Sequence, residues 1–207
     1  MAKTSAVRKD ENTGSEPVQL GDRAIDNLKF IRETIARSTQ FTAVPGYGGI
    51  LMGVTALVAG YIASTQIYVS DSLTTWLVEA ALAFAIGLLA MWQKSKIGGQ
   101  SLLSTPAKKF ARGFAPPLAV GVAITLGLWQ HGYYYVMAPV CMLCYGAAVV
   151  CGGAFSVRVV PVMGWCFMVL GAVAFLLPTG YGNAMMATSF GGLHIVFGAV
   201  IARWYGG

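Results

Sequence analysis

Six apolar segments, each close to the length that crosses a bilayer as a helix, dominate this chain of 207 residues. A transmembrane helix needs roughly 20 mostly apolar residues, because hydrocarbon offers the backbone no other hydrogen-bond partner. Only 11% of the residues are charged, whereas soluble domains carry about a quarter. We therefore predict an all-α polytopic membrane protein, with six transmembrane helices in three hairpins within residues 41–207. The expected spans are Gly46–Tyr68, Leu73–Trp92, Phe114–Trp129, Tyr133–Phe155, Val159–Leu177 and Ala184–Ala202.

The first 40 residues are polar and divide into two parts. Met1–Leu20 lacks an apolar period and the apolar stretch of a signal peptide. We expect residues 1–20 to be a disordered cytoplasmic tail, and the first span to act as the insertion signal. In Gly21–Gln40, Leu28, Ile31 and Ile35 recur at helical spacing, which predicts a cytoplasmic amphipathic helix. It either lies on the membrane surface or is a solvated lead-in to the first span.

The basic residues predict the orientation. Of the 14 Lys and Arg residues, seven precede the first expected span and five lie between the second and third. One more lies between the fourth and fifth spans, and one follows the sixth. Cytoplasmic segments carry an excess of Lys and Arg. Both termini are therefore expected in the cytoplasm, which requires an even number of spans.

The first span carries a stripe of small residues at alternating spacings of three and four. In lipid, helices associate by close backbone approach, which small residues permit. We predict that this stripe is a helix-packing seam, and its members are Gly46, Gly49, Gly53, Ala56, Gly60 and Ala63.

Two polar residues stand out inside the expected spans. Glu79 is the only acid within a span, and an intramembrane carboxylate is by default a functional hypothesis. It is either a proton-coupling or cation-binding site, or a neutral carboxylic acid that hydrogen-bonds across helices or reaches the outer interface. His194 lies on the glycine-rich face of the sixth span. It is either a metal or haem ligand or, as we favour, a structural hydrogen-bonding residue.

Cys141 and Cys144 form a C-x-x-C motif in the fourth span, at about the depth of His194. Two thiolates and an imidazole would suit a soft ion such as Cu(I). The motif resembles the intramembrane C-x-x-C of quinone-coupled disulfide-forming membrane proteins. Those proteins also use a second cysteine pair in an outer loop, and here all four cysteines lie in apolar segments. We favour a packing role for the cysteines and predict no cofactor.

Three short motifs carry a second resemblance. They are Ile31-Arg32-Glu33-Thr34, the Phe-Thr-Ala-Val-Pro-Gly-x-Gly-Gly run over Phe41–Gly49, and Phe-Gly-Gly-Leu-His-Ile-Val-Phe-Gly over Phe190–Gly198. From about Asp26 to the end, the chain resembles a family of bacterial six-span inner-membrane proteins to which no activity is attached. The resemblance implies a bacterial inner membrane and carries no mechanism.

These observations favour a non-enzymatic accessory, sensor or assembly protein. It would contact lipid headgroups or another protein through Gly21–Gln40 and the basic segment Gln93–Arg112, with no nucleic-acid partner. The chain contains neither the H-E-x-x-H motif nor a phosphate-binding Walker loop. One alternative is a small transporter or channel subunit that uses Glu79 and His194. Another is a membrane redox or metal-binding protein that uses Cys141, Cys144 and His194.

Overall fold

The computed structural model describes residues 21–31, 40–99 and 101–206, and it divides into two units, 1–39 and 40–207. In the first unit, residues 21–31 form a helix whose side chains are all exposed. The rest of the predicted helix Gly21–Gln40, apart from Gln40 itself, and the predicted tail 1–20 lie outside the described residues. Membrane attachment of this segment therefore stays a prediction.

The second unit is built from helices. Its described residues contain no strand, and one isolated bridge joins Phe41 to Ser156. The principal helices are α2 (Gly46–Thr65), α3 (Val69–Ile97), α4 (Thr105–Gln130), α5 (Met137–Gly153) and α6 (Val159–Ala174). The last helical segment consists of α7 (Gly182–Met186), a π-helical stretch η3 (Ala187–Leu193) and α8 (His194–Tyr205). Short 3-10 turns precede α5 (Tyr134–Val136) and α7 (Thr179–Tyr181).

Five of these helical segments are long and apolar enough to cross a membrane, and α6 is a shorter apolar helix of 16 residues. The prediction of an all-helical bundle compatible with a membrane is thus confirmed. At about 1.5 Å per residue, α6 is roughly 24 Å long, somewhat less than the hydrocarbon core of a typical bilayer.

The third expected span begins earlier than the apolar pattern indicates. It was predicted from Phe114, whereas α4 starts at Thr105. Ser104 explains the early start, since its side chain accepts a hydrogen bond from the backbone N–H of Ala107 at 3.4 Å. Pro106 then occupies the first turn, where the missing N–H has no helical partner in any case. Apolar periodicity misses this start because the first turns of α4 are polar.

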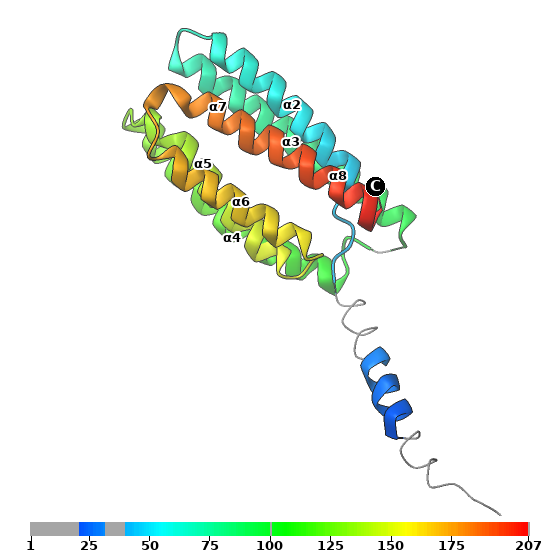
Figure 1. Ribbon diagram of the computed structural model, residues 1–207. Coiled ribbons are helices and arrows are strands. Elements are labelled where there is room, and N and C mark those ends of the chain that lie inside the picture. Colours follow the sequence, from blue (N-terminus) through cyan, green and yellow to red (C-terminus); the bar gives the residue numbers. More distant parts are fainter. Residues whose placement is uncertain (1–20, 32–39, 100, 207) are drawn as a thin grey trace, which may run out of the picture. The chain divides into compact units, whose positions relative to one another are not determined.

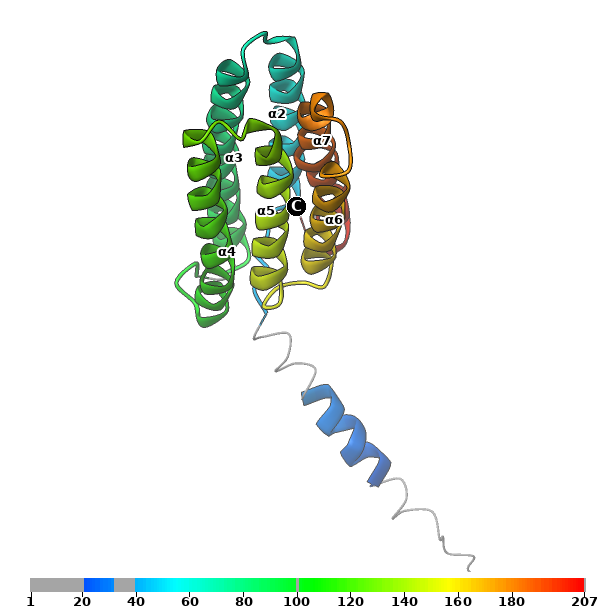
Figure 2. The ribbon, with the colours of Figure 1, turned by 90° about the vertical axis from the view of Figure 1, so that its left-hand side faces the viewer.

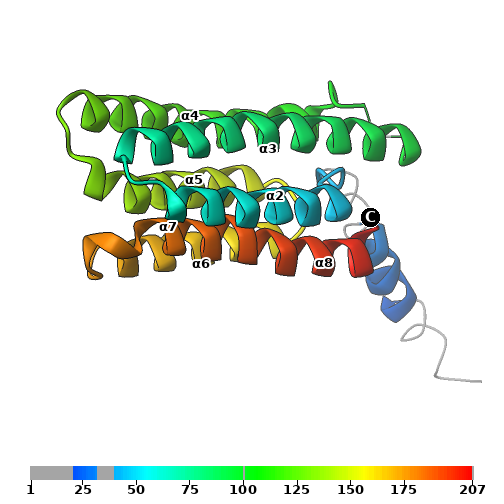
Figure 3. The same cartoon turned by 90° about the horizontal axis from the view of Figure 1, so that it is seen from above.

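The helices form two layers of three (Figures 1 and 3). One layer contains α3, α2 and the α7–α8 segment, with α2 in the middle, and the other contains α4, α5 and α6, with α5 in the middle. The consecutive pairs α2–α3 and α4–α5 pack closely. By contrast, α6 packs chiefly on α5, and α8 packs chiefly on α2. The last two helices therefore face each other across the layers instead of forming the tightest pair (Figure 2).

The small-residue stripe of α2 is buried against the last helical segment. A Cβ at Gly53 would lie 2.6 Å from the carbonyl oxygen of Gly191, and one at Gly49 would lie 3.2 Å from the Cα of Gly198. A second close crossing joins α5 to α6, where a Cβ at either Gly146 or Gly164 would lie 2.7 Å from the other's carbonyl oxygen. These backbones touch because neither helix carries a side chain at the crossing.

The segment before α2 ties the two layers together at one end. The N–H of Phe41 donates to the carbonyl of Phe155 at 2.8 Å, and the hydroxyl of Ser156 donates to the carbonyl of Phe41 at 2.7 Å. The Phe41 ring packs at 5.1 Å from that of Phe110 on α4. The chain therefore enters α2 from a fixed point between the layers.

Candidate functional site

His194 forms a hydrogen-bonded pair with Tyr145 between the two layers. The Tyr145 hydroxyl lies 2.8 Å from Nε2 of His194, and Nδ1 lies 2.8 Å from the carbonyl oxygen of Phe190. A carbonyl only accepts, so Nδ1 carries the hydrogen and Nε2 accepts from the tyrosine. Both ring nitrogens of His194, which is only 6% exposed, are therefore engaged in hydrogen bonds within the protein.

Aromatic rings surround this pair. Phe167 of α6 is completely buried, and its ring centroid lies 4.9 Å from that of Tyr145 and 5.5 Å from that of His194. Phe190 stacks nearly parallel to His194 at 6.2 Å. Residues of three helical segments thus meet in one apolar cluster that excludes water from the polar pair. The side chains of Tyr145, Phe167, Phe190 and His194 are called the aromatic cluster below.

The helix that carries His194 is irregular immediately before it. Residues Ala187–Leu193 form a π-helical stretch, a geometry that is rare and frequent at functional sites. Within it, the hydroxyl of Ser189 donates to the carbonyl of Met185 at 2.8 Å. The wider helical turn shifts the register of the residues that follow, including His194.

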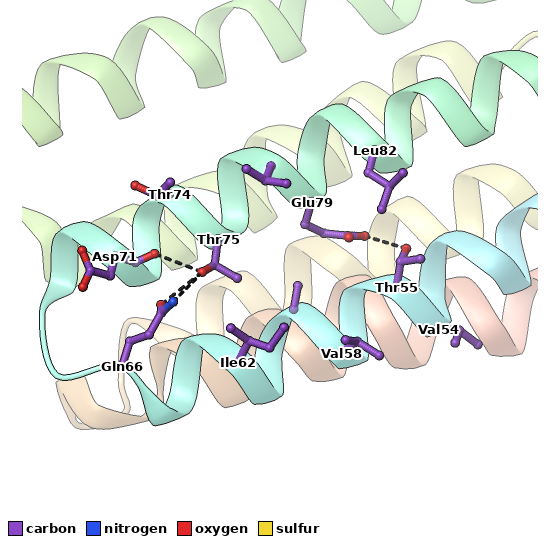
Figure 4. A pocket seen from close by; sticks show the side chains of 12 residues that line it. Val54, Thr55, Val58, Ile62, Gln66, Asp71, Thr74, Thr75, Glu79 and Leu82 are labelled. Carbon is purple, nitrogen blue, oxygen red and sulfur yellow. Dashed lines mark hydrogen bonds between the residues drawn. The ribbon is translucent and has the colours of Figure 1, made fainter.

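Glu79 faces α2 from α3. Its Oε1 accepts a hydrogen bond from the Thr55 hydroxyl at 2.8 Å, and the residue is 7% exposed. The Thr55 oxygen also lies 2.9 Å from the carbonyl of Met52 in its own helix. The carboxyl group lies at the floor of a groove between the two helices (Figure 4).

The groove is polar at the end where α2 and α3 are joined. Gln66 and Thr75 hydrogen-bond across it at 2.9 Å, and Asp71 belongs to the same rim (Figure 4).

Close to this end, Asn183 links all three helices of its layer. Its Oδ1 accepts from the indole N–H of Trp76 at 2.9 Å, and its Nδ2 donates to the carbonyl of Ala63 at 3.1 Å.

The cysteines of α5 face α4. The sulfur of Cys141 lies 3.4 Å from the Thr125 hydroxyl, and a Cβ at Gly121 would lie 2.6 Å from the Cβ of Cys144. All four cysteines are free thiols. The cysteine face of α5 therefore lies in the α4–α5 packing surface, while Tyr145 on the same helix points to His194.

The described residues do not bring the predicted metal or redox set together. Within that part of the chain, no group of three or more His, Cys, Asp or Glu side chains is arranged to hold a metal ion. Cys141 and Cys144 contact α4, whereas His194 contacts Tyr145 and Phe190. Glu79 and His194 also have separate surroundings, one in the α2–α3 groove and the other in the aromatic cluster.

Lys94 has a role that the sequence did not indicate. Its ammonium donates to the carbonyl of Val44 at 2.9 Å, to that of Tyr205 at 3.0 Å, and to that of Gly206. It therefore binds the carbonyl end of α8 and the start of the first span at once. Of the five basic residues expected to face lipid headgroups, Lys94 is engaged inside the protein, and Lys96, Lys108, Lys109 and Arg112 are exposed.

Sequence reasoning missed the partners of the polar residues, namely Tyr145, Thr55 and Asn183. The signal that could have found Thr55 is that it is the one Ser or Thr in the sequence between Gly46 and Ala63, next to Ala56 of the small-residue stripe. Comparison with protein-family models, with curated proteins and with solved structures finds no match to this chain.

Proposed function

We propose that this protein is a non-enzymatic helical bundle of a bacterial inner membrane, which acts through a partner as an accessory, sensor or assembly protein. One observation carries the proposal: His194 uses both ring nitrogens in hydrogen bonds within the protein. An imidazole held in this way stabilises the contact between the two layers. It has no free nitrogen to offer a metal ion or a substrate.

The proposed topology is six spans that alternate in direction, with both termini in the cytoplasm; of the three hairpins predicted from the sequence, the last has helices that pack chiefly on other neighbours. Its support is the distribution of charge. The helices alternate in direction along the chain (Figure 1), so that all Lys and Arg residues described in the second unit lie at one end. Under the positive-inside rule, that end faces the cytoplasm. These residues are Lys94, Lys96, Lys108, Lys109, Arg112, Arg158 and Arg203.

The proposed contact surfaces are the arm Gly21–Gln40 and the basic segment Gln93–Arg112. The exposed Lys108, Lys109 and Arg112 on the first turns of α4 give the second surface its charge. Attraction to anionic lipid contributes about 1 kcal/mol per basic residue near the surface. Such a surface suits a membrane protein with an acidic cytoplasmic segment, close to the headgroups.

Site-specific photo-crosslinking in cells tests the partner role. A photoreactive amino acid replaces Lys108 or Lys29, and in the control it replaces Leu126, an exposed apolar residue farther along α4. We expect one discrete protein adduct from positions 108 and 29, and none from 126. When the photoreactive residue is at position 108, changing Lys109 and Arg112 to Ala should weaken the protein adduct. Equal adducts at all three positions, or none at any, would contradict the proposal.

A small transporter or channel subunit is the second candidate, favoured by the position of Glu79 in an open groove. The predicted route needs Glu79 and His194 on one path, but His194 lies in the aromatic cluster and outside the groove, so a route through the groove would use Glu79 without His194. Proteoliposomes that contain the purified protein test this, because flux of a transported cation should be lost in Glu79→Gln and retained in Lys96→Met.

A further inference from the structure

The groove between α2 and α3 is open to the side. Its volume is about 580 Å³, within the range of roughly 300–1,000 Å³ typical of ligand pockets. Val58 and Val78 form opposite walls and are 55% and 64% exposed. In a bilayer, such walls face the acyl chains, so a ligand would enter from the lipid.

Glu79 places a carboxyl oxygen toward this groove. Its Oε1 is held by Thr55 at 2.8 Å, while no described residue hydrogen-bonds its Oε2. Among the described residues, no fully buried side-chain oxygen or nitrogen lacks a hydrogen bond. Oε2 therefore reaches the groove surface, where it is available to accept.

The charge of the groove has one sign. Its lining includes Glu79 and Asp71, and none of the residues that line it is Lys, Arg or His. The remaining wall is mainly aliphatic, from Val54, Ile62 and Leu82 as well as the two valines. An acid enclosed by apolar walls is stabilised by a cation brought in by a ligand, because burial of the acid alone is costly.

We propose that the α2–α3 groove binds an amphiphilic organic cation. The positive group of the ligand pairs with Glu79, and its apolar body lies against Val58, Ile62 and Val78. An inorganic cation fits poorly, since such ions require several oxygen ligands and the deep part of the groove offers Glu79 and Thr55. An anionic ligand would be repelled by Glu79 and Asp71. The proposal goes beyond the partner role and does not depend on it.

Binding of tetraphenylphosphonium to the purified protein in lipid nanodiscs tests the proposal. This probe is permanently cationic and apolar, and tetraphenylborate has the same shape with the opposite charge. We expect saturable binding of about one cation per chain, and no saturable binding of tetraphenylborate when it is measured separately. Glu79→Gln should weaken the binding by about tenfold or more, since one member of a buried charge pair is lost.

Two further variants keep the result interpretable if Glu79→Gln unfolds. Val58→Trp fills the groove and leaves Glu79 in place, so it should also remove binding. Val162→Trp places the same side chain on the exposed face of α6, where Val162 is 53% exposed, and should bind like the wild type.

Each alternative outcome is distinct. No binding to the wild type, equal binding in Glu79→Gln, or equal affinity for tetraphenylborate would each overturn the proposal. If the cation failed to bind, and a photoreactive residue placed in the groove itself gave a protein adduct that Val58→Trp removed, the groove would be a docking site for a membrane helix instead. Crosslinking from Lys108 is unaffected by these variants, so failure here and failure of the partner role are separate results.

Discussion

At the scale of single residues, the molecule uses its intramembrane polar groups in pairs that join different helices. Tyr145 with His194 joins the two layers, and Thr55 with Glu79 joins α2 to α3. The first pair satisfies the buried imidazole, and the second engages Oε1 of Glu79 and leaves Oε2 toward the groove; an unpaired polar group is costly in an apolar environment. The sequence indicated that His194 points inward, and it singled out Glu79. It could not supply Tyr145, because a partner 49 residues away in the other layer leaves no local spacing pattern.

The Tyr145–His194 bond should contribute measurably to stability. Tyr145→Phe keeps the ring in the aromatic cluster but removes the hydroxyl hydrogen, so that Nε2 of His194 is left buried and unpaired. The expected cost is about 1–3 kcal/mol, seen as a lower midpoint of thermal unfolding in detergent. Tyr181→Phe is the control, since Tyr181 is 54% exposed. An unchanged midpoint in Tyr145→Phe would mean that the hydrogen bond does not stabilise the fold.

At the scale of elements, the apolar pattern predicted six helical segments, and the structure has a helix in each. The boundaries moved where local chemistry outweighs hydropathy, as at the Ser104 cap of α4. The π-helical stretch before His194 could not be expected from the sequence, because its register depends on packing against α2. The crossing of Gly146 with Gly164 was also missed, since the glycines on the contact face of each helix stand seven residues apart, with larger residues between them, and form no continuous stripe.

The contact between α2 and the last helix provides the first test at this scale. Gly53→Leu would place a side chain into the backbone of Gly191 and Ile195, where even a Cβ has no room. Overpacking of this kind costs roughly 1–3 kcal/mol, and thermal unfolding in detergent should reveal the loss. Gly127→Leu on α4 is the matched control, because nothing lies within 4 Å of a Cβ there. If both variants melted alike, close contact at Gly53 would be refuted.

The hydrogen bonds of Lys94 provide the second test at the scale of elements. Lys94→Met retains most of the aliphatic chain but leaves the carbonyls of Val44, Tyr205 and Gly206 without their common donor. Hydrogen bonds to a charged group contribute about 1.5–3 kcal/mol, and a cation at a helix C-terminus adds a favourable dipole interaction. We expect the end of α8 to fray, visible as faster amide hydrogen exchange around Trp204. Lys96→Met, which removes only a contact over the Trp92 ring at 3.7 Å, should leave that exchange unchanged.

At the scale of the whole molecule, the two-layer arrangement was beyond sequence reasoning. The distribution of charge predicts which end of each helix faces the cytoplasm. It contains no information on which helices are neighbours within the membrane plane. The expected pairing of the fifth and sixth spans illustrates this. Their connection makes them consecutive, yet glycine crossings direct α6 to α5 and α8 to α2.

The proposed topology is testable by labelling from outside the cell. In a variant without native cysteines, single cysteines replace Asp71, His131 or Lys108, all of which are exposed. An impermeant maleimide should label positions 71 and 131 in intact cells, and position 108 only after the membrane is opened. Labelling of position 108 from outside would exclude the six-span topology.

The unequal lengths of the helices have a consequence for the surrounding lipid. α3 has 29 residues and α6 has 16, so they measure about 43 Å and 24 Å along their axes. They lie at diagonally opposite corners of the bundle (Figures 2 and 3). Only the apolar part of each helix meets the acyl chains, and α3 is polar at both ends, with Asp71 in its first turn and Lys94 and Lys96 in its last. Beside the shorter α6 the bilayer thins to match, at a fraction of a kcal/mol per Å of mismatch. The protein therefore imposes a gradient of bilayer thickness across its own width, and short-chain lipids should collect on the α6 side.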